Sequence, residues 1–459
     1  MVAIYLIVGL LGLGIIVFVH ELGHFIAAKA VGIDVEAFAL GWGPPIISFR
    51  KGNTDYRLCA FPVGGYCKMK GEQLIEKRMD GLPVEDSDIE RSLFGVSPLK
   101  RILTYFAGPF ANVLFAVFFF SLVWIIGSEY YSYNSRIIVL ADYPQVFSQN
   151  GGYPAVEAGL KSGDIVLSLN GTPVKNYRDI QDAISRNPDI TMSITFSRNG
   201  ETLSSVITPE LNKHSGTGFI GVAPWIPTLV SSTQPGLPAH VAGIRSGDII
   251  TRVNGESVNN YADLLSGIQL SLKANRTPEI GITRDKKFLT LNLPVDKASL
   301  SLEDIGLSFE SNRYVDEERN PFKALIHGVS DTVDVFVLSV RGISLLFKGI
   351  DLKETVSGPL RITYTVGQYA VFGFSQGFKH GVVTILKFIS FISVALCFMN
   401  LLPLPAVDGG MILYNGIEIF RRKPLSMKFF YRFQMAGIVV IAVLLFTSLF
   451  NDIRYFFFK

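Results

Sequence analysis

Two histidines and a glutamate near the amino terminus have the residue types and the spacing of a zinc-protease site. They form His20-Glu21-Leu22-Gly23-His24, an HExxH motif. On a helix, residues four positions apart share a face, so both imidazoles can bind one metal ion while Glu21 lies close enough to act as a base. The motif follows directly on residues 2–19, an apolar run without a charge. Ionisable residues at the end of a membrane span are costly unless they face a metal or a cavity, so this position indicates function.

The composition indicates a protein that is partly membrane and partly soluble. The chain has 459 residues, of which 49% are hydrophobic and only 18% charged. No basic block is interleaved with aromatic residues, so nucleic-acid binding has no support. Cys59, Cys67 and Cys397 are too few and too poorly placed for a disulfide framework or a thiolate zinc site. The first apolar run lacks a basic leader and a small-residue cleavage site, so we expect it to be retained.

Hydropathy predicts four transmembrane helices, at about residues 2–28, 102–127, 381–402 and 435–450. Lysine and arginine gather in the connections 29–101 and 411–434, so the positive-inside rule predicts that these face the cytoplasm and that both termini and residues 128–380 lie outside. Residues 321–349 are also apolar, but Lys323, Asp331, Asp334 and Arg341 interrupt them. We expect an amphipathic helix there, on the outer face or on a domain, because a fifth span would separate the two halves of the metal site described below.

A repeat occupies the outer region. Residues 152–171 return as residues 236–255, at a constant offset of 84 positions, which indicates tandem domains. Each unit reads as a short helix, a strand, an Asn-Gly turn and a second helix. The pattern resembles the PDZ domain in its circularly permuted form, which implies a groove for extended peptides. A loop capping a peptide carboxylate is expected in the second unit at Gly218, Phe219, Ile220, Gly221 and Val222. The alternative is that its glycines merely build a tight turn.

Asp408 is the candidate for a third metal ligand, because a catalytic zinc normally has three protein ligands. Two prolines precede it and two glycines follow it, and the predicted topology places it on the side of His20 and His24. Residues 34–70 are rich in strand formers and predict a small sheet beside the metal helix, either to hold an extended substrate or to cover the helix ends. Asn112, in the second span, is expected to hold a substrate carbonyl or the oxyanion, or only to tie two helices together.

These motifs together resemble the site-2 protease family over essentially the whole chain. The resemblance implies one Zn²⁺ per chain held by His20, His24 and Asp408, with Glu21 as the base. It also implies single-span membrane proteins as substrates, an anti-sigma factor trimmed by a first protease or remnant signal peptides among them. Substrate-binding residues implied by the resemblance and the predicted sheet are Asn112, Gly64, Gly65, Tyr66, Asn400, Pro403 and Pro405. Two residues depart from expectation: Met411 follows Asp-Gly-Gly, and Lys387 interrupts the third span.

The expected fold is a polytopic α-helical membrane protein with four transmembrane helices, a small membrane-associated β-sheet on the cytoplasmic side and two tandem α+β PDZ domains outside. We expect a monomer in the bacterial inner membrane, in contact with lipid, whose PDZ pair gates access by size. The alternatives are a metal-ion transporter and an inactive PDZ scaffold. The predicted segments are 1–33, 34–101, 102–127, 128–217, 218–311, 312–380, 381–410, 411–434 and 435–459.

Overall fold

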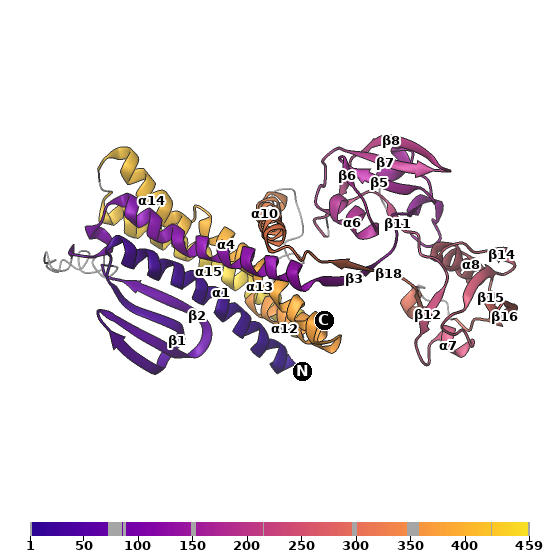
Figure 1. Ribbon diagram of the computed structural model, residues 1–459, viewed down its shortest axis with the longest axis horizontal. Coiled ribbons are helices and arrows are strands. Elements are labelled where there is room, and N and C mark those ends of the chain that lie inside the picture. The colour runs from indigo at the N-terminus through magenta and orange to yellow at the C-terminus, as the bar shows by residue number, and fades with distance from the viewer. Residues whose placement is uncertain are drawn as a thin grey trace. The chain divides into compact units, whose positions relative to one another are not determined.

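The chain forms two compact units in the computed structural model (Figure 1). One comprises Met1–Ser128 and Val315–Lys459, and the other comprises Glu129–Tyr314. The first holds the long apolar helices and the HExxH motif, and the second holds the sequence repeat. The structure describes residues 2–71, 85, 89–147, 153–213, 215–295, 301–346, 358–423 and 425–457.

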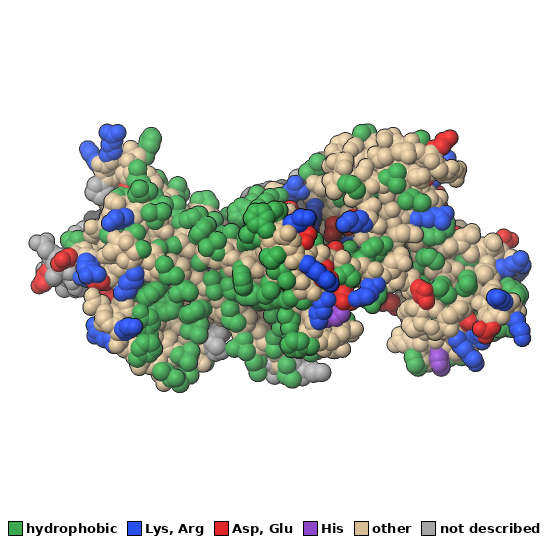
Figure 2. All heavy atoms as spheres, viewed as in Figure 1, with side chains coloured by type: hydrophobic (Ala, Val, Ile, Leu, Met, Phe, Trp, Pro, Cys, Tyr) green, Lys and Arg blue, Asp and Glu red, His purple; other side chains and the backbone are tan. Residues whose placement is uncertain are grey.

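The four predicted spans are confirmed as four helices. Within the described residues, four helices are long and apolar enough to cross a membrane: α1 (Val2–Val31), α4 (Pro98–Ile126), α13 (Phe378–Leu401) and α15 (Met427–Phe457). Hydrophobic side chains cover the visible face of this unit, as lipid contact requires (Figure 2). Close packing holds α1 against α4, since a Cβ added at Gly23 would lie 2.3 Å from the carbonyl oxygen of Ala107.

Residues 321–346 form a helix, α10 (Pro321–Leu346), which is not among the four candidate spans. It packs against α4 and α13. The indole Nε1 of Trp124 donates to Asp331 Oδ2 at 2.8 Å, and the ring of Phe336 meets that of Phe398 edge-on at 5.5 Å. One of the charges that argued against a span therefore has a partner on α4. Lys387 is also paired, because its Nζ donates to Ser128 Oγ.

A further helix, α12 (Pro359–Ser375), packs against α1, α13 and α15. Its first turn is capped by Asp452 of α15, a fully buried acid beyond the predicted limit of the fourth span. The carboxylate accepts hydrogen bonds from the backbone N–H groups of Gly358, Leu360 and Arg361 at 2.8, 3.0 and 3.2 Å. These donors have no partner within their own helix, so the buried charge stabilises the α12 terminus and ties it to α15.

The predicted sheet consists of two bent strands, β1 (Val35–Lys51) and β2 (Thr54–Met69). Their near ends pair as a hairpin, from Lys51 with Thr54 to Pro45 with Cys59, and residues 65–69 return to pair with residues 35–40. The hairpin exposes large apolar side chains: Trp42, Ile46, Ile47, Phe49 and Phe61 are each at least 57% exposed. An apolar surface of this kind marks a site of contact with a membrane or with another protein.

Two small modules make up the unit Glu129–Tyr314, and they repeat each other in structure. Each has a four-stranded antiparallel sheet, with the strand orders β6-β5-β7-β8 and β14-β13-β15-β16. Each also has the predicted order of helix, strand, Asn-Gly turn and helix. The bounds in the first module are α5 (Pro154–Glu157), β5 (Ile165–Leu169), β6 (Thr172–Pro173), α6 (Tyr177–Ser185), β7 (Met192–Arg198) and β8 (Glu201–Ile207). Those in the second are α7 (Pro238–Val241), β13 (Ile249–Val253), β14 (Glu256–Ser257), α8 (Tyr261–Lys273), β15 (Glu279–Arg284) and β16 (Lys287–Asn292).

The boundary between the modules differs from the predicted one at residues 217 and 218. Strand β10 (Gly218–Phe219) pairs with β9 (Glu210–Leu211), and β11 (Val222–Pro224) pairs with β4 (Ile137–Val139). Ile220 lies in the core of the first module. The assignment of residues 218–222 to the second module is therefore wrong. In the second module, the corresponding segment leads into β17 (Leu307–Phe309), and β17 pairs with β12 (Val230–Thr233).

Strand β4 belongs to both modules. Ile137 and Val139 enter the first core, whereas Ile138 enters the second, as the alternation of side chains along a strand requires. Tyr143 adds a polar link, because its hydroxyl donates to Asp263 Oδ1 at 2.9 Å and accepts from Asn260 Nδ2 at 3.1 Å. The two modules are thus joined by strand β4, which contributes to both cores, as well as by the Tyr143 hydrogen bonds.

Candidate active site

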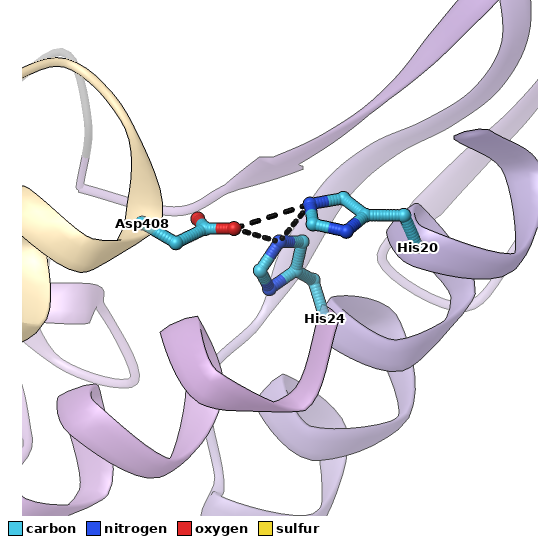
Figure 3. A group of neighbouring side chains, drawn as sticks. All are labelled: His20, His24 and Asp408. Carbon is cyan, nitrogen blue, oxygen red and sulfur yellow. Dashed lines mark hydrogen bonds and ion pairs between the residues drawn. The ribbon is translucent and has the colours of Figure 1, made fainter. Parts of the chain in front are cut away.

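Three side chains from two helices converge on one point in the first unit (Figure 3). His20 and His24 lie one turn apart on α1, and Asp408 is the first residue of α14 (Asp408–Arg421). The Nε2 atoms of the two histidines are 3.1 Å apart, and Asp408 Oδ2 lies 3.1 Å from His20 Nε2 and 3.3 Å from His24 Nε2. The structure therefore brings together the three residues that the sequence predicts as metal ligands.

The geometry of this cluster fits a tetrahedral zinc ion. Zinc bonds of about 2.0–2.2 Å separate ligand atoms by about 3.3–3.5 Å in a tetrahedral site, close to the three distances observed. Both histidines are buried, and Asp408 Oδ2 is a buried oxygen without a hydrogen-bond partner. A buried carboxylate oxygen between two imidazole nitrogens suits a metal ligand, which binds in its ionised form.

The outer nitrogens of both imidazoles are held by α4. His24 Nδ1 lies 2.8 Å from the carbonyl oxygen of Thr104, which can only accept, so Nδ1 carries the proton and Nε2 is free for the metal. His20 Nδ1 lies 3.2 Å from the amide of Asn112, whose Oδ1 is otherwise unpaired. Amide oxygen and nitrogen are interchangeable by a flip, and ligation through His20 Nε2 selects the orientation with Oδ1 facing Nδ1–H. Asn112 therefore lies where it can orient a ligand.

The close approach of α4 to His24 depends on a glycine. A Cβ added at Gly108 would lie 2.4 Å from His24 Nε2 and 2.5 Å from Cε1, far inside van der Waals contact. Gly108 thus leaves the space in which the imidazole stands. The Asp408 segment has the same requirement, because a Cβ at Gly409 would lie 2.2 Å from the Leu402 carbonyl oxygen and one at Gly410 would lie 2.1 Å from that of Leu404. The two glycines after Asp408 therefore permit the predicted close approach of the backbone.

The three residues and Glu21 open on a cavity of about 550 Å³. Glu21 is adjacent to both histidines and accepts a hydrogen bond from the backbone of Cys67. The cavity is lined by residues of α1, β1, β2, α4, α14 and α15 and of the segments beside them: His20, Glu21, His24, Trp42, Gly65, Tyr66, Cys67, Met69, Leu93, Phe94, Tyr105, Asn400, Ala406, Val407, Asp408, Met411, Phe430 and Gln434. The side chain of Glu21 thus lines the same cavity as the three candidate ligands.

The predicted substrate-binding residues divide into two groups. Gly65, Tyr66 and Asn400 line the cavity, and residues 65–69 pair with residues 35–40 in the sheet. The others lie behind the cavity surface: Gly64 adjoins Trp42, Pro403 lies in the turn between α13 and α14, and Pro405 contacts Gly437 of α15. Met411, which departs from the expected motif, is buried against Tyr414 and Phe430.

A buried ion pair fixes the helix that carries Asp408. Arg101 Nη1 lies 3.0 Å from Glu418 Oε2 and 3.1 Å from Asn415 Oδ1, and Glu418 Oε1 accepts from the Leu425 backbone N–H at 3.0 Å. The Arg101 side chain is 12% exposed and that of Glu418 6%. Sequence reasoning counted Arg101 only as a topological signal and did not consider Glu418. A lone acid on an otherwise apolar helix face was the available signal.

A second cavity, of about 730 Å³, lies in the first module beside α6. Gly218, Phe219, Ile220 and Val222 contribute to its wall, together with Tyr177, Arg178 and Ile184. Gly221 is not part of this wall, and its φ of +83° places it at a turn. The predicted peptide loop thus flanks a groove, but in the first module.

A comparison with known protein families identifies the family of this chain. The family model described as peptidase family M50 matches residues 8–444. The chain belongs to peptidase family M50. This is the site-2 protease family that the motifs resemble, and the M50 chain is accordingly a zinc metalloprotease with several membrane-spanning helices.

Named relatives agree with the M50 assignment over nearly their full length. A putative zinc metalloprotease of Treponema pallidum is 32% identical over 99% of this chain and 100% of its own. Protease RseP of Yersinia pestis is 29% identical, over 96% of this chain and 97% of its own. The regulator of sigma-E protease RseP of Escherichia coli is 26% identical over the same shares.

Proposed function

We propose that the protein is an intramembrane endopeptidase that cleaves transmembrane segments of single-span membrane proteins. The observation that carries the proposal is the position of the site: His20 and His24 lie within the first candidate span, Ile4–Val31, and Asp408 meets them there. A metal site at this depth can reach a peptide bond that lies within or near the bilayer. The substrate must then be presented unwound, because backbone groups in a helix are shielded.

His20, His24 and Asp408 would hold the zinc, which supplies a Lewis acid that polarises the scissile carbonyl and acidifies water. Glu21 acts as the general base: its carboxylate takes a proton from the attacking water and later delivers it to the leaving amide nitrogen. The hydrogen bond from the Cys67 backbone holds one side of this carboxylate. Thr104 and Asn112 would fix the two imidazole rings, and neither of them lines the cavity.

The variant Glu21→Gln tests the assigned base. It should retain zinc and lose cleavage of a single-span peptide in detergent or bilayer, because Gln has the same shape and no basic oxygen. Asn112→Leu is the matched comparison, since it should weaken zinc binding about 10–100-fold while leaving Glu21 intact, and Asn112→Asp should restore it. Cleavage by Glu21→Gln at the rate of the unaltered protein would show that another group is the base. Uptake of zinc into proteoliposomes would instead favour the metal-ion transporter, and failure of the unaltered protein to cleave any peptide would favour the scaffold.

We further propose that residues 65–69, four of which line the cavity, receive the substrate as an added strand on the side of the cavity. Gly65 and Cys67 lie two positions apart on the strand, so their backbone N–H groups point to the same side. The Cys67 N–H points toward Glu21 and away from residues 35–40. An extended substrate on this edge would pass directly beside the base. Asn400, Pro403 and Pro405 would seat its other side.

Two native thiols test this placement. Cys67 lines the cavity, whereas Cys59 lies in the same strand outside the lining. A substrate with one cysteine near its scissile bond, bound to Glu21→Gln, should form a disulfide with Cys67 and none with Cys59. Equal yields at the two positions, or a disulfide with Cys59 alone, would contradict the added strand.

The two modules are proposed to be PDZ domains that act as a size gate for substrates with a large outer domain. Their duplicated topology and the groove beside α6 support this reading. Deletion of residues 129–314 should then permit cleavage of an untrimmed substrate while leaving the rate for a trimmed one unchanged. Unaltered selectivity would refute the gate. In a bacterial inner membrane, with the modules outside and the metal site toward the cytoplasm, a monomer of this kind would act on an anti-sigma factor or on remnant signal peptides.

A further inference from the structure

The carboxyl end of α14 presents an aromatic and basic surface that the protease reaction does not use. Phe420 is 91% exposed, and Arg421, Arg422 and Lys423 beside it are exposed as well. Figure 2 shows lysine and arginine side chains over this end of α14, next to hydrophobic ones. These four residues are called the α14 tip below.

Nothing in the described part of the chain neutralises the α14 tip. No carboxylate of the described residues lies within 4 Å of its three cations. Between Asp408 and Asp452 the sequence contains one acid, Glu418, and both of its oxygens are engaged, by Arg101 and by the Leu425 N–H. The basic residues suit the carboxyl end of a helix dipole, but a dipole alone gives no reason for a fully exposed phenylalanine among them.

The position of the α14 tip along the spans is fixed by its neighbours. The contact between Arg101 and Glu418 places the last turn of α14 level with the first turn of α4, where the second candidate span, Pro98–Ile126, begins. On its other side the chain enters the span Phe429–Phe456, and Tyr414 packs edge-on against Phe430 at 4.9 Å. The α14 tip therefore lies at the depth where two spans leave the hydrocarbon, which is the depth of lipid headgroups.

We propose that the α14 tip binds anionic phospholipid at this face of the membrane. Phe420 would enter the boundary between headgroups and acyl chains, and the three cations would meet lipid phosphates. Charge complementarity carries the choice of partner, because each lysine or arginine near an anionic leaflet strengthens binding to it by about five-fold. An aromatic residue beside basic ones is also typical of interfacial segments.

The consequence concerns the metal centre, because the same helix carries Asp408 at its other end. α14 runs unbroken from Asp408 to Arg421, so a lipid-held tip and the buried Arg101–Glu418 pair would fix the direction in which the carboxylate points. The anchoring contact and the ligand are about 20 Å apart along the helix, at 1.5 Å per residue. Lipid charge would then influence the site without any contact with the substrate.

Fluorescence quenching by brominated lipid tests the proposal on the full chain in bilayer nanodiscs. In Phe420→Trp, acyl-brominated phosphatidylglycerol should quench the new tryptophan more strongly than acyl-brominated phosphatidylcholine at equal mole fraction. The parent protein, which has three tryptophans, is measured in parallel and its signal subtracted. Replacing Arg421, Arg422 and Lys423 by Gln in the same variant should reduce quenching by phosphatidylglycerol to the level of phosphatidylcholine.

Two control positions keep the result decisive. Phe446, which is 72% exposed on α15 within the last candidate span, should as Trp be quenched equally by both lipids, also in the triple-Gln background. Phe288, 56% exposed in the second module, should as Trp be quenched by neither. If Phe420→Trp behaves like the Phe288 control, the tip does not touch lipid and the proposal is overturned. Equal quenching by both lipids would overturn the recognition of anionic headgroups.

Discussion

Replacing Gly108 by alanine should remove zinc from the active site without unfolding the protein. The added methyl would lie 2.4 Å from His24 Nε2, whereas ordinary contact begins at 3.4 Å, so the imidazole or α4 must move by about 1.0 Å. The ring cannot turn away freely, because Nδ1 is held by the Thr104 carbonyl at 2.8 Å. Zinc–nitrogen bonds tolerate about 0.2 Å, so a displacement of this size removes a ligand.

The expected loss of zinc affinity exceeds the 10–100-fold that a lost outer-shell contact costs, and is therefore at least about 100-fold. Overpacking should cost about 1–3 kcal/mol of stability, which alanine's higher helix propensity partly offsets. Zinc competition with a chromophoric chelator measures affinity, and thermal unfolding of the metal-free protein measures stability.

Gly416→Ala is the matched control for Gly108→Ala. This glycine is also inside a helix, α14, but a Cβ there meets no atom within 4 Å. It should keep zinc and gain about 0.5–1 kcal/mol from reduced backbone entropy. Zinc affinity and cleavage by Gly108→Ala equal to those of Gly416→Ala would refute the steric argument, and with it the role of α4 in holding His24.

Three further predictions concern residues outside the metal centre. Arg101→Met and Glu418→Leu should each lower the free energy of unfolding by about 3–5 kcal/mol, because either change leaves a buried charge unpaired. The double variant should recover most of the lost stability. Additive losses in a double-mutant cycle would refute the pairing. Asp452→Ala should lower the free energy of unfolding by about 1–2 kcal/mol and increase hydrogen exchange at the start of α12. Asp452→Asn should have an intermediate effect on both. Unchanged hydrogen exchange would exclude the cap. Burial raises the pKa of Asp248, but hydrogen bonds from Arg284 outweigh burial and hold the pKa below its usual value of 3.8. The ion pair therefore stabilises the second module above pH 3.8, and this stabilisation is lost as the pH falls further. Hydrogen exchange in β13 and β15 should rise on acidification, and Asp248→Asn should abolish this dependence.

The convergence of His20, His24 and Asp408 could be predicted because each part has a local signal. HExxH is readable from helical spacing alone, and Asp408 follows from topology, since only a span that runs parallel to the first brings it to the same side. The glycines after Asp408 were likewise readable, because a close backbone approach leaves few other residue types.

Contacts that depend on tertiary packing had no such signal. Asn112 was expected to hold the substrate or to tie two helices together, and it does join α4 to α1. That its partner on α1 is His20 depends on how the two helices pack, which the sequence does not encode locally. The cap formed by Asp452 and the shared strand β4 join segments far apart in the chain. The wrong module boundary has the same origin: strand pairing decides where residues 218–222 belong, and a linear repeat does not show it.

The metal centre is assembled from two segments made at very different times. His24 and Asp408 are 384 positions apart, and at about 5–20 residues per second the ribosome needs about 20 to 80 s to pass from one to the other. During that interval the first span already displays two histidines and a base but lacks the carboxylate. A nascent chain in the insertion machinery therefore has an incomplete set of ligands while other membrane segments pass beside it. The proposed metal site can therefore be complete only once the third span and the start of α14 are in place.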